Sequence, residues 1–204
     1  MLTFVVFLLL LCVTTVAGSV PAAPSELPAI DYSADRIIEG ATGIVSTKFY
    51  STQDKERIET DANGTLSVVI LRRDMQGGYV LTPAQKKYQG IRLSSAQKMS
   101  RVPSLDQMSL TAVGMEVLGG DPTTKFRANM NDGSATGFVW LTRDRIPVKM
   151  ELTSGAGPSA QRVTIVLKNI VRGAQSPELF ELPVGYGSIP SPGAMGMSGG
   201  STIW

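Results

Sequence analysis

The 204-residue sequence contains no histidine and a single cysteine, Cys12. The absence of histidine removes the commonest general base, the commonest metal ligand and every catalytic triad built on an imidazole ring. Aromatic residues make up only 6% of the chain and charged residues 18%. Lysine plus arginine (19) nearly balance aspartate plus glutamate (17), and the basic residues are scattered, which argues against a nucleic-acid-binding protein.

Catalytic and cofactor motifs are also missing. The sequence holds no Gly-x-Ser-x-Gly elbow, no phosphate-binding loop and no cluster of metal ligands at a familiar spacing. Its acidic residues lie beside turn residues or basic neighbours, where a solvated or turn-capping role is the ordinary one. We therefore predict a non-enzymatic protein with no catalytic residue, no metal site and no cofactor. An enzyme that uses only carboxylates, lysine or serine is the least favoured alternative.

The chain begins with an uncharged apolar run from Leu2 to Gly18. An apolar core of roughly 7–15 residues followed by small residues, here Ala17 and Gly18, is typical of a secretory signal peptide. A membrane-spanning helix needs about 20 apolar residues, so this run is slightly short for one. We predict a signal peptide over residues 1–18 and a periplasmic protein. The alternative is a membrane anchor formed by the same segment, left uncleaved.

Composition divides the rest of the chain into three parts. Residues 19–30 are rich in Pro, Ala and Ser and predict an extended linker. Residues 187–204 are dominated by Gly, Ser and Pro with two Met, and predict a flexible tail because they cannot bury enough apolar surface to offset chain entropy. Residues 31–186 are long enough for one domain with a sizeable core. Since Cys12 lies in the predicted signal, the mature protein would contain no thiol.

Short strands separated by turns dominate residues 31–186. The dipeptide Asn63-Gly64 is the strongest hairpin signal, because a type I′ turn needs positive φ at both central positions. Short strands with Gly-, Asn- and Asp-rich turns predict a mainly β fold, a single strongly curved antiparallel sheet that forms an incomplete barrel. The predicted strands are Tyr32–Ile38, Ile44–Tyr50, Lys55–Asp61, Leu66–Arg72, Tyr79–Thr82, Lys87–Leu93, Lys125–Met130, Thr136–Thr142, Val148–Leu152 and Arg162–Lys168.

Helical signals are confined to the middle of this domain. Ser94 can cap a short helix that runs to Met99. Ser104 and Gln107 fit a capping box for a second short helix over Leu105–Leu110. Helices this short cannot form a domain of their own, so we expect them to cover one side of the sheet.

Large apolar side chains on the later strands are the candidate site. If they project from neighbouring strands onto one surface, they form either an ordinary core or the wall of an apolar pocket. Met and large aromatic residues adapt well to flexible apolar ligands, but the sequence does not separate a filled interior from a hollow one. The candidate ligand-binding residues are Phe126, Met130, Phe138, Trp140, Met150 and Ile165.

Five segments follow one another in a recognisable order: Val113–Gly120, Thr124–Phe126, Gly133–Leu141, Ile146–Met150 and Leu179–Tyr186. As an ordered set they resemble an uncharacterised bacterial envelope family (a domain of unknown function), itself similar to the LolA/LolB superfamily of lipoprotein carriers. The resemblance covers roughly residues 32–186. It implies an incomplete β-barrel wrapped over short helices, with an apolar cavity for acyl chains. In the carriers an arginine helps to control cavity closure, and Arg57 and Arg72 are both open as its counterpart. We expect residues 180–186 to form a turn at a strand end that packs against the sheet.

Two functions follow as hypotheses. The first is an exported, non-enzymatic binding protein that holds a lipid, an acyl chain or another apolar ligand in the concave face of the sheet. Burial of each methylene contributes about 0.8 kcal/mol, so a chain of about ten methylenes needs no further chemistry to bind. The second is a structural or interaction module of the cell envelope, with a filled core, no small ligand and a protein partner.

Overall fold

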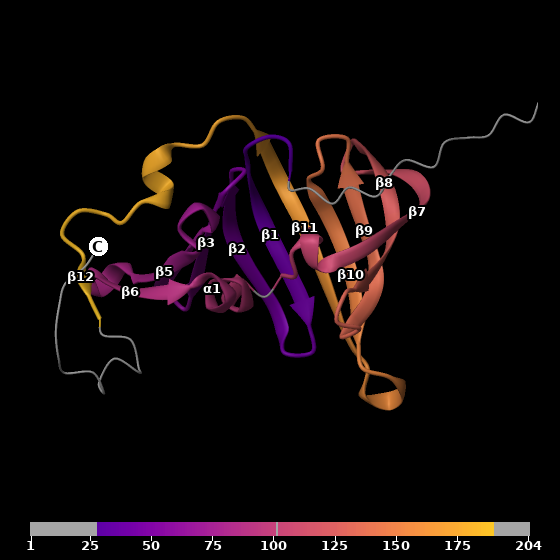
Figure 1. Ribbon diagram of the computed structural model, residues 1–204, viewed down its shortest axis with the longest axis horizontal. Coiled ribbons are helices and arrows are strands. Elements are labelled where there is room, and N and C mark those ends of the chain that lie inside the picture. The colour runs from indigo at the N-terminus through magenta and orange to yellow at the C-terminus, as the bar shows by residue number, and fades with distance from the viewer. Residues whose placement is uncertain (1–27, 101, 190–204) are drawn as a thin grey trace, which may run out of the picture.

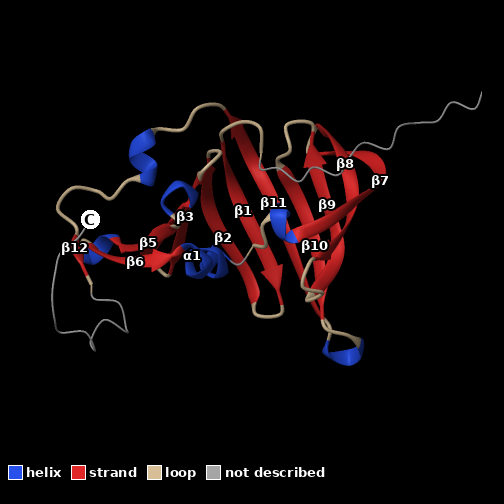
Figure 2. Ribbon diagram, viewed as in Figure 1, coloured by secondary structure: helices blue, strands red, loops and turns tan. Residues whose placement is uncertain are grey.

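The computed structural model describes residues 28–100 and 102–189, which form one sheet of twelve strands accompanied by one α-helix and short 3₁₀ turns (Figures 1 and 2). The predicted mainly β architecture with a single, mostly antiparallel sheet is confirmed. The predicted signal peptide with Cys12, most of the linker and residues 190–204 of the predicted tail lie outside the described residues.

The sheet consists of two meanders that meet in its centre. The first runs outward from β1 to β6, the second runs inward from β7 to β11, and β11 pairs with β1. The full strand order is β12-β6-β5-β4-β3-β2-β1-β11-β10-β9-β8-β7, and the short β12 pairs with β6 in parallel. The strands are β1 (Tyr32–Gly40), β2 (Gly43–Ser51), β3 (Lys55–Ala62), β4 (Thr65–Arg72), β5 (Gly77–Thr82), β6 (Lys87–Arg92), β7 (Met108–Leu118), β8 (Asp121–Met130), β9 (Ala135–Thr142), β10 (Pro147–Ser154), β11 (Gln161–Arg172) and β12 (Gly187–Ser188).

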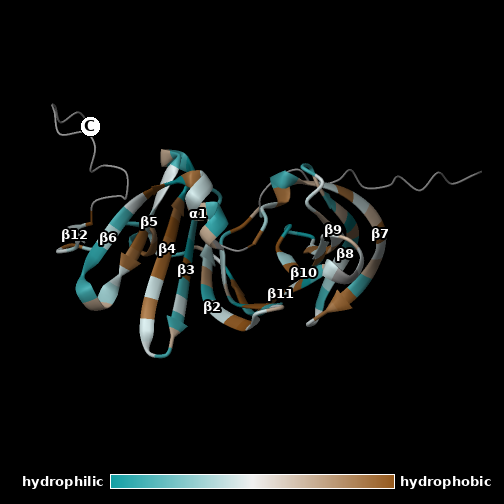
Figure 3. Ribbon diagram, turned by 90° about the horizontal axis from the view of Figure 1, so that it is seen from below, coloured by the Kyte–Doolittle hydropathy of each residue, from teal (hydrophilic) through white to brown (hydrophobic). Residues whose placement is uncertain are grey.

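Because β6 and β7 lie in opposite halves of the sheet, the chain between them must cross one face. This crossing segment consists of the helix α1 (Leu93–Ser100) and the 3₁₀ turn η3 (Leu105–Gln107). We call the face that it crosses the inner face; Figure 3 shows α1 and the crossing segment on that side of the sheet. Ala96 of α1 packs into the core of one half and Leu105 of η3 into the core of the other.

The prediction of a second helix over Leu105–Leu110 is wrong beyond the first turn. Ser104 and Gln107 do form the predicted capping box, but the helical turn ends at Gln107 and the strand β7 begins at Met108. The sheet overrides the local helix signal, because β7 pairs with β8 from Met108 opposite Met130 to Leu118 opposite Asp121. The one α-helix of the described residues, α1, agrees with the predicted helix from Ser94 to Met99.

A C-terminal segment (residues 176–186) covers part of the opposite, outer face. It contains the 3₁₀ turn η5 (Pro177–Phe180), whose Phe180 is buried in a cluster with Val68, Ile70 and Leu81 of β4 and β5. This segment packs the sheet as predicted, but it lies across the face of the strands rather than at a strand end. The next two residues form β12, so the first part of the predicted tail is a strand.

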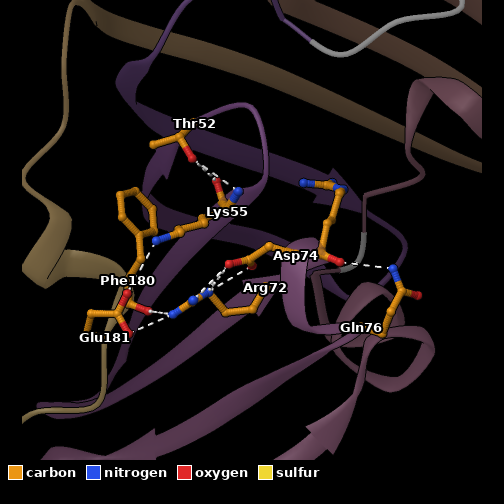
Figure 4. Close-up of polar contacts among 8 residues, drawn as sticks. Thr52, Lys55, Arg72, Asp74, Gln76, Phe180 and Glu181 are labelled. Atoms are coloured by element: carbon orange, nitrogen blue, oxygen red, sulfur yellow. Dashed lines mark hydrogen bonds and ion pairs between the residues drawn. The ribbon is translucent and has the colours of Figure 1, made fainter.

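Polar contacts fix the C-terminal segment to β3 and β4 (Figure 4). The Arg72 guanidinium lies 2.7 Å from the Glu181 carboxylate and donates a hydrogen bond of 3.3 Å to the carbonyl of Phe180. Hydrogen bonds to Asp74 and Glu181 raise the pKa of Arg72, and the hydrogen bond from Arg72 lowers the pKa of Asp74. Arg57 donates a hydrogen bond of 2.9 Å to the carbonyl of Leu179. Arg57 and Arg72 therefore fix the C-terminal segment to the outer face of the sheet.

Candidate functional site

A partly enclosed cavity of about 70 Å³, hereafter the enclosed cavity, lies between the inner face and the crossing segment and is still partly open to solvent. Its floor comes from the two strands at the centre of the sheet and their neighbours, and Val102 and Leu105 of the crossing segment cover it. Ligand sites for drug-sized molecules typically hold roughly 300–1,000 Å³. The enclosed cavity is therefore too small for an acyl chain unless the crossing segment moves.

A larger groove of about 500 Å³ adjoins this cavity on the inner face, beside the end of α1 at Met99. Polar side chains occupy neighbouring positions along its floor, because Ser67 pairs with Thr60, Thr60 with Thr47, and Thr47 with Arg36. Apolar side chains flank this polar row on both sides. They are Ile58 and Val69 on one side and Ile38 and Val45 on the other. The groove is thus wide enough for a small amphiphile and offers both apolar and hydrogen-bonding surface.

Arg36 lines both the enclosed cavity and the groove, although its side chain is only 4% exposed. Its guanidinium carbon lies 4.8 Å from the centre of the Phe49 ring. Burial lowers the pKa of Arg36, while the negative charge of Glu56 raises it. The Glu56 carboxylate is itself 2.5 Å from the Arg73 guanidinium. Burial also raises the pKa of the Tyr32 hydroxyl, so this group is neutral at physiological pH.

Four of the six predicted site residues share the inner face. Phe126 and Met150 both lie opposite Val139 of β9, and Met150 lies opposite Ile165, so these side chains form one row across four strands. Met130 lies further along β8 and packs against the same cluster. Leu105 and Met108 complete this cluster, and Met150 and Ile165 also line the enclosed cavity. Their side chains form a packed interior with a small residual space.

Phe138 and Trp140 project from the outer face, so the prediction of one shared surface is wrong for these two. The register explains the difference, because Val139 rather than its neighbours lies opposite Phe126. Trp140 lies opposite Lys125 on one side and Lys149 on the other, and both ammonium groups lie close to its ring, at 4.7 Å and 4.6 Å from the centre. The Trp140 indole N–H donates a hydrogen bond to Glu116.

The sequence did not predict the polar row of the groove, which consists of Arg36, Thr47, Thr60 and Ser67. Arg36 is the most important of these omissions. The available signal was the alternation in β1, where Tyr32, Ala34, Arg36 and Ile38 occupy successive inner positions. A cation in the middle of an otherwise apolar face is uncommon, because burying a charge is costly. The two arginines left open by the family resemblance, Arg57 and Arg72, line neither the enclosed cavity nor the groove.

No group of three or more Cys, Asp or Glu side chains placed to hold a metal ion occurs among residues 28–100 and 102–189. Across the same residues, no helix is long and apolar enough to span a bilayer.

Solved structures share this fold at low sequence identity. An uncharacterised conserved protein from Thermus thermophilus is similar over 79% of this chain and 90% of its own, with a TM-score of 0.54 and 11% identity. MucB is similar over 79% of this chain, with a TM-score of 0.51 and 14% identity. The match spans 60% of the MucB chain.

The similar structures also include a LolA superfamily protein from Nitrosomonas europaea. It matches over 78% of this chain and 94% of its own, with a TM-score of 0.46 and 11% identity. No family model and no curated protein sequence matches the chain. At these identities the comparisons establish the fold alone.

Proposed function

We propose that this protein is a non-enzymatic binding protein of the periplasm that holds a lipid or acyl chain on the inner face of its sheet. The observation that carries the proposal is the groove of about 500 Å³ beside α1, which falls within the range of ligand sites. The ligand would lie in this groove rather than among Phe126, Met150 and Ile165, whose side chains pack against one another.

The fold and the chemistry of the described residues support this proposal. The crossing segment lies over the inner face, so a shift of this segment would join the enclosed cavity to the groove through their shared lining residue, Arg36. An incomplete barrel that curves around this face would shelter the chain of the ligand from water. Export by the segment at residues 1–18 would place the protein in the compartment where lipids move between membranes.

Filling the groove tests this function. Ser67 lies on its floor and is exposed, so Ser67→Trp would occupy the space of the ligand without disturbing a buried contact. We expect the affinity of the full chain for dansyl-undecanoic acid, measured by fluorescence enhancement, to fall by about tenfold or more, which corresponds to about 1.4 kcal/mol. Thr136→Trp, at an exposed position of β9, is the matched control and should bind as the wild type does. Absence of binding by the wild type, or equal binding by Ser67→Trp, would refute the proposal.

The edge strand β7 favours a second candidate function, the docking of an envelope protein. β7 ends the sheet among the described residues, and its Val113, Met115 and Val117 side chains are exposed, Met115 to 79%. Edge strands with apolar side chains are templates for an added strand from a partner. An extended segment of a partner protein would pair with the backbone of β7 and cover these three residues.

Photo-crosslinking distinguishes this second function from ligand binding. A benzophenone amino acid in place of Met115 should crosslink one partner, identified by mass spectrometry, in envelope preparations from the native host. The same amino acid in place of Met75, which is exposed on a 3₁₀ turn remote from β7, is the control. The same crosslinked proteins at both positions would rule out specific docking at β7.

A further inference from the structure

The second half of the edge strand β7 carries three exposed apolar side chains at alternate positions. Val113, Met115 and Val117 are 47%, 79% and 67% exposed, and β7 lies at one end of the sheet (Figure 1). Within residues 28–100 and 102–189, no other strand carries more than one large apolar residue that is exposed. Single exposed apolar residues are ordinary on a protein surface, whereas a contiguous group is typical of an interaction site.

This edge has little of the protection that edge strands usually have. Natural edge strands avoid unwanted pairing by being very short, by carrying lysine or proline, or by containing a bulge. β7 is eleven residues long and contains no Lys, Arg or Pro, whereas the opposite edge of the sheet is the two-residue strand β12. The register between β7 and β8 does shift between Ala112 and Gly114. Pairing at this edge is therefore confined to about five residues, Val113–Val117.

The order of residues in this half of β7 is self-complementary. When two identical strands pair antiparallel about a two-fold axis, the axis must pass through one residue position, because directly opposed side chains share a face. An axis at Met115 places Val113 opposite Val117 of the second copy, and Met115 opposite its own counterpart. On the other face it places Glu116 opposite Gly114, so no like charges meet.

The neighbouring registers are less favourable. An axis at Glu116 would bring the two Glu116 carboxylates directly opposite each other, and like charges in that position destabilise a strand pair. An axis at Gly114 would pair Val113 with Met115 but would leave Val117 opposite Thr111. The axis at Met115 is thus the register of the three that covers all three exposed apolar side chains with apolar partners.

We propose that two copies of this protein associate through their β7 strands, which pair antiparallel about Met115. This inference rests on the second proposed function, because it names the occupant of the same edge. Backbone groups of the two edges bond to each other, and each copy covers Val113, Met115 and Val117 of the other. One short strand from each copy makes a small interface, and interfaces below about 1,200 Å² are typical of transient complexes. We therefore expect a dissociation constant on the order of micromolar.

Analytical ultracentrifugation of the protein purified from its native host, at about 1–100 μM, tests the association. We expect the mass to rise from one copy to two across this range. Met115→Lys places two ammonium groups opposite each other and should stay monomeric throughout. Met75→Lys makes the same change at an exposed methionine of a 3₁₀ turn and should associate as the wild type does. A monomeric wild type, or equal association by Met115→Lys, would overturn the proposal.

Disulfide crosslinking in oxidised glutathione tests the register. Met115→Cys should give a covalent dimer, because opposed residues of antiparallel strands have Cα atoms about 4.5–5.5 Å apart, within the range of a disulfide. Val113→Cys and Val117→Cys should crosslink when mixed but not singly, since identical positions would then lie roughly 13 Å apart along the strand. The wild type, whose one cysteine is Cys12, is the control. Equal crosslinking by all three variants singly would overturn the register.

Photo-crosslinking from position 115 separates this inference from the function on which it rests. A crosslink to a second copy of this chain supports both. A crosslink to a different protein, together with a monomeric purified protein, would overturn the second copy as occupant and keep the docking function of β7. A monomer without any specific crosslink would overturn both.

Discussion

Replacement of Trp140 by alanine is expected to lower the free energy of unfolding by about 3–5 kcal/mol and to leave lipid binding unchanged. The side chain is only 3% exposed and belongs to a cluster that includes Ile146 and Val148. Its removal would leave a cavity, and it would also remove the hydrogen bond to Glu116 and the ring beside two lysines. Because Trp140 projects from the outer face, it does not line the groove.

Urea denaturation followed by far-ultraviolet circular dichroism measures this loss without relying on the indole as a probe. Met115→Ala is a suitable control, since an exposed side chain away from buried contacts should change stability by no more than about 0.5 kcal/mol. A Trp140→Ala variant of nearly normal stability with weakened lipid binding would mean that Trp140 belongs to the ligand site. That result would favour the original grouping of Trp140 with Met150 and Ile165.

Phe180→Ala is expected to cost a similar amount, about 3–5 kcal/mol, although Phe180 lies in a segment with little regular structure. Its ring is 1% exposed and is surrounded by Val68, Ile70 and Leu81 on the outer face of the sheet. Without it the C-terminal segment would lose its buried apolar anchor and keep the partly buried contacts of Leu179, Leu182 and Tyr186, together with its polar contacts to the sheet. The outer surface of β4 and β5 would then become accessible to water.

Val184 provides the matched control for Phe180, because it belongs to the same segment and is fully exposed, at 102%. Val184→Ala should therefore unfold at the same urea concentration as the wild type. Hydrogen exchange adds a local measurement, since the amides of β4 and β5 should exchange faster in Phe180→Ala but not in Val184→Ala. Unchanged stability and exchange in Phe180→Ala would show that the C-terminal segment does not stabilise the sheet.

The order of strands and turns could be predicted well where local chemistry decides it. Asn63 and Gly64 have φ angles of 54° and 80°, as the two-residue hairpin turn requires, and Ala62 pairs with Thr65 across it. The strands at Lys125–Met130 and Val148–Leu152 were predictable because their apolar and charged residues alternate. These signals depend on neighbours in the sequence and on the period of two that a strand imposes.

The faces and the site could not be predicted in the same way. Residues 136–142 are apolar on both faces, so alternation alone gave no reason to place Trp140 outside and Val139 inside. The crossing of the inner face by residues 93–107 arises because β6 and β7 lie in opposite halves of the sheet. That placement depends on the pairing of β1 with β11, which are far apart in the sequence and have no local signature. The groove was missed because it is defined by polar residues on four different strands, among them Arg36 and Ser67.

The pairing of the two meanders also has a consequence for how the chain folds. The strands at the centre of the sheet are separated in sequence by nearly the whole domain. Asp35 and Asn169, for example, are 134 positions apart, yet their side chains form a hydrogen bond. Such distant contacts make folding slow, because the intervening chain must first be ordered. If the chain emerges with its N-terminus first, β1 can pair with β2 at once. The other edge of β1 stays unpaired until β11 has emerged. During that interval the open edge would be able to pair with another chain, so aggregation would compete with folding.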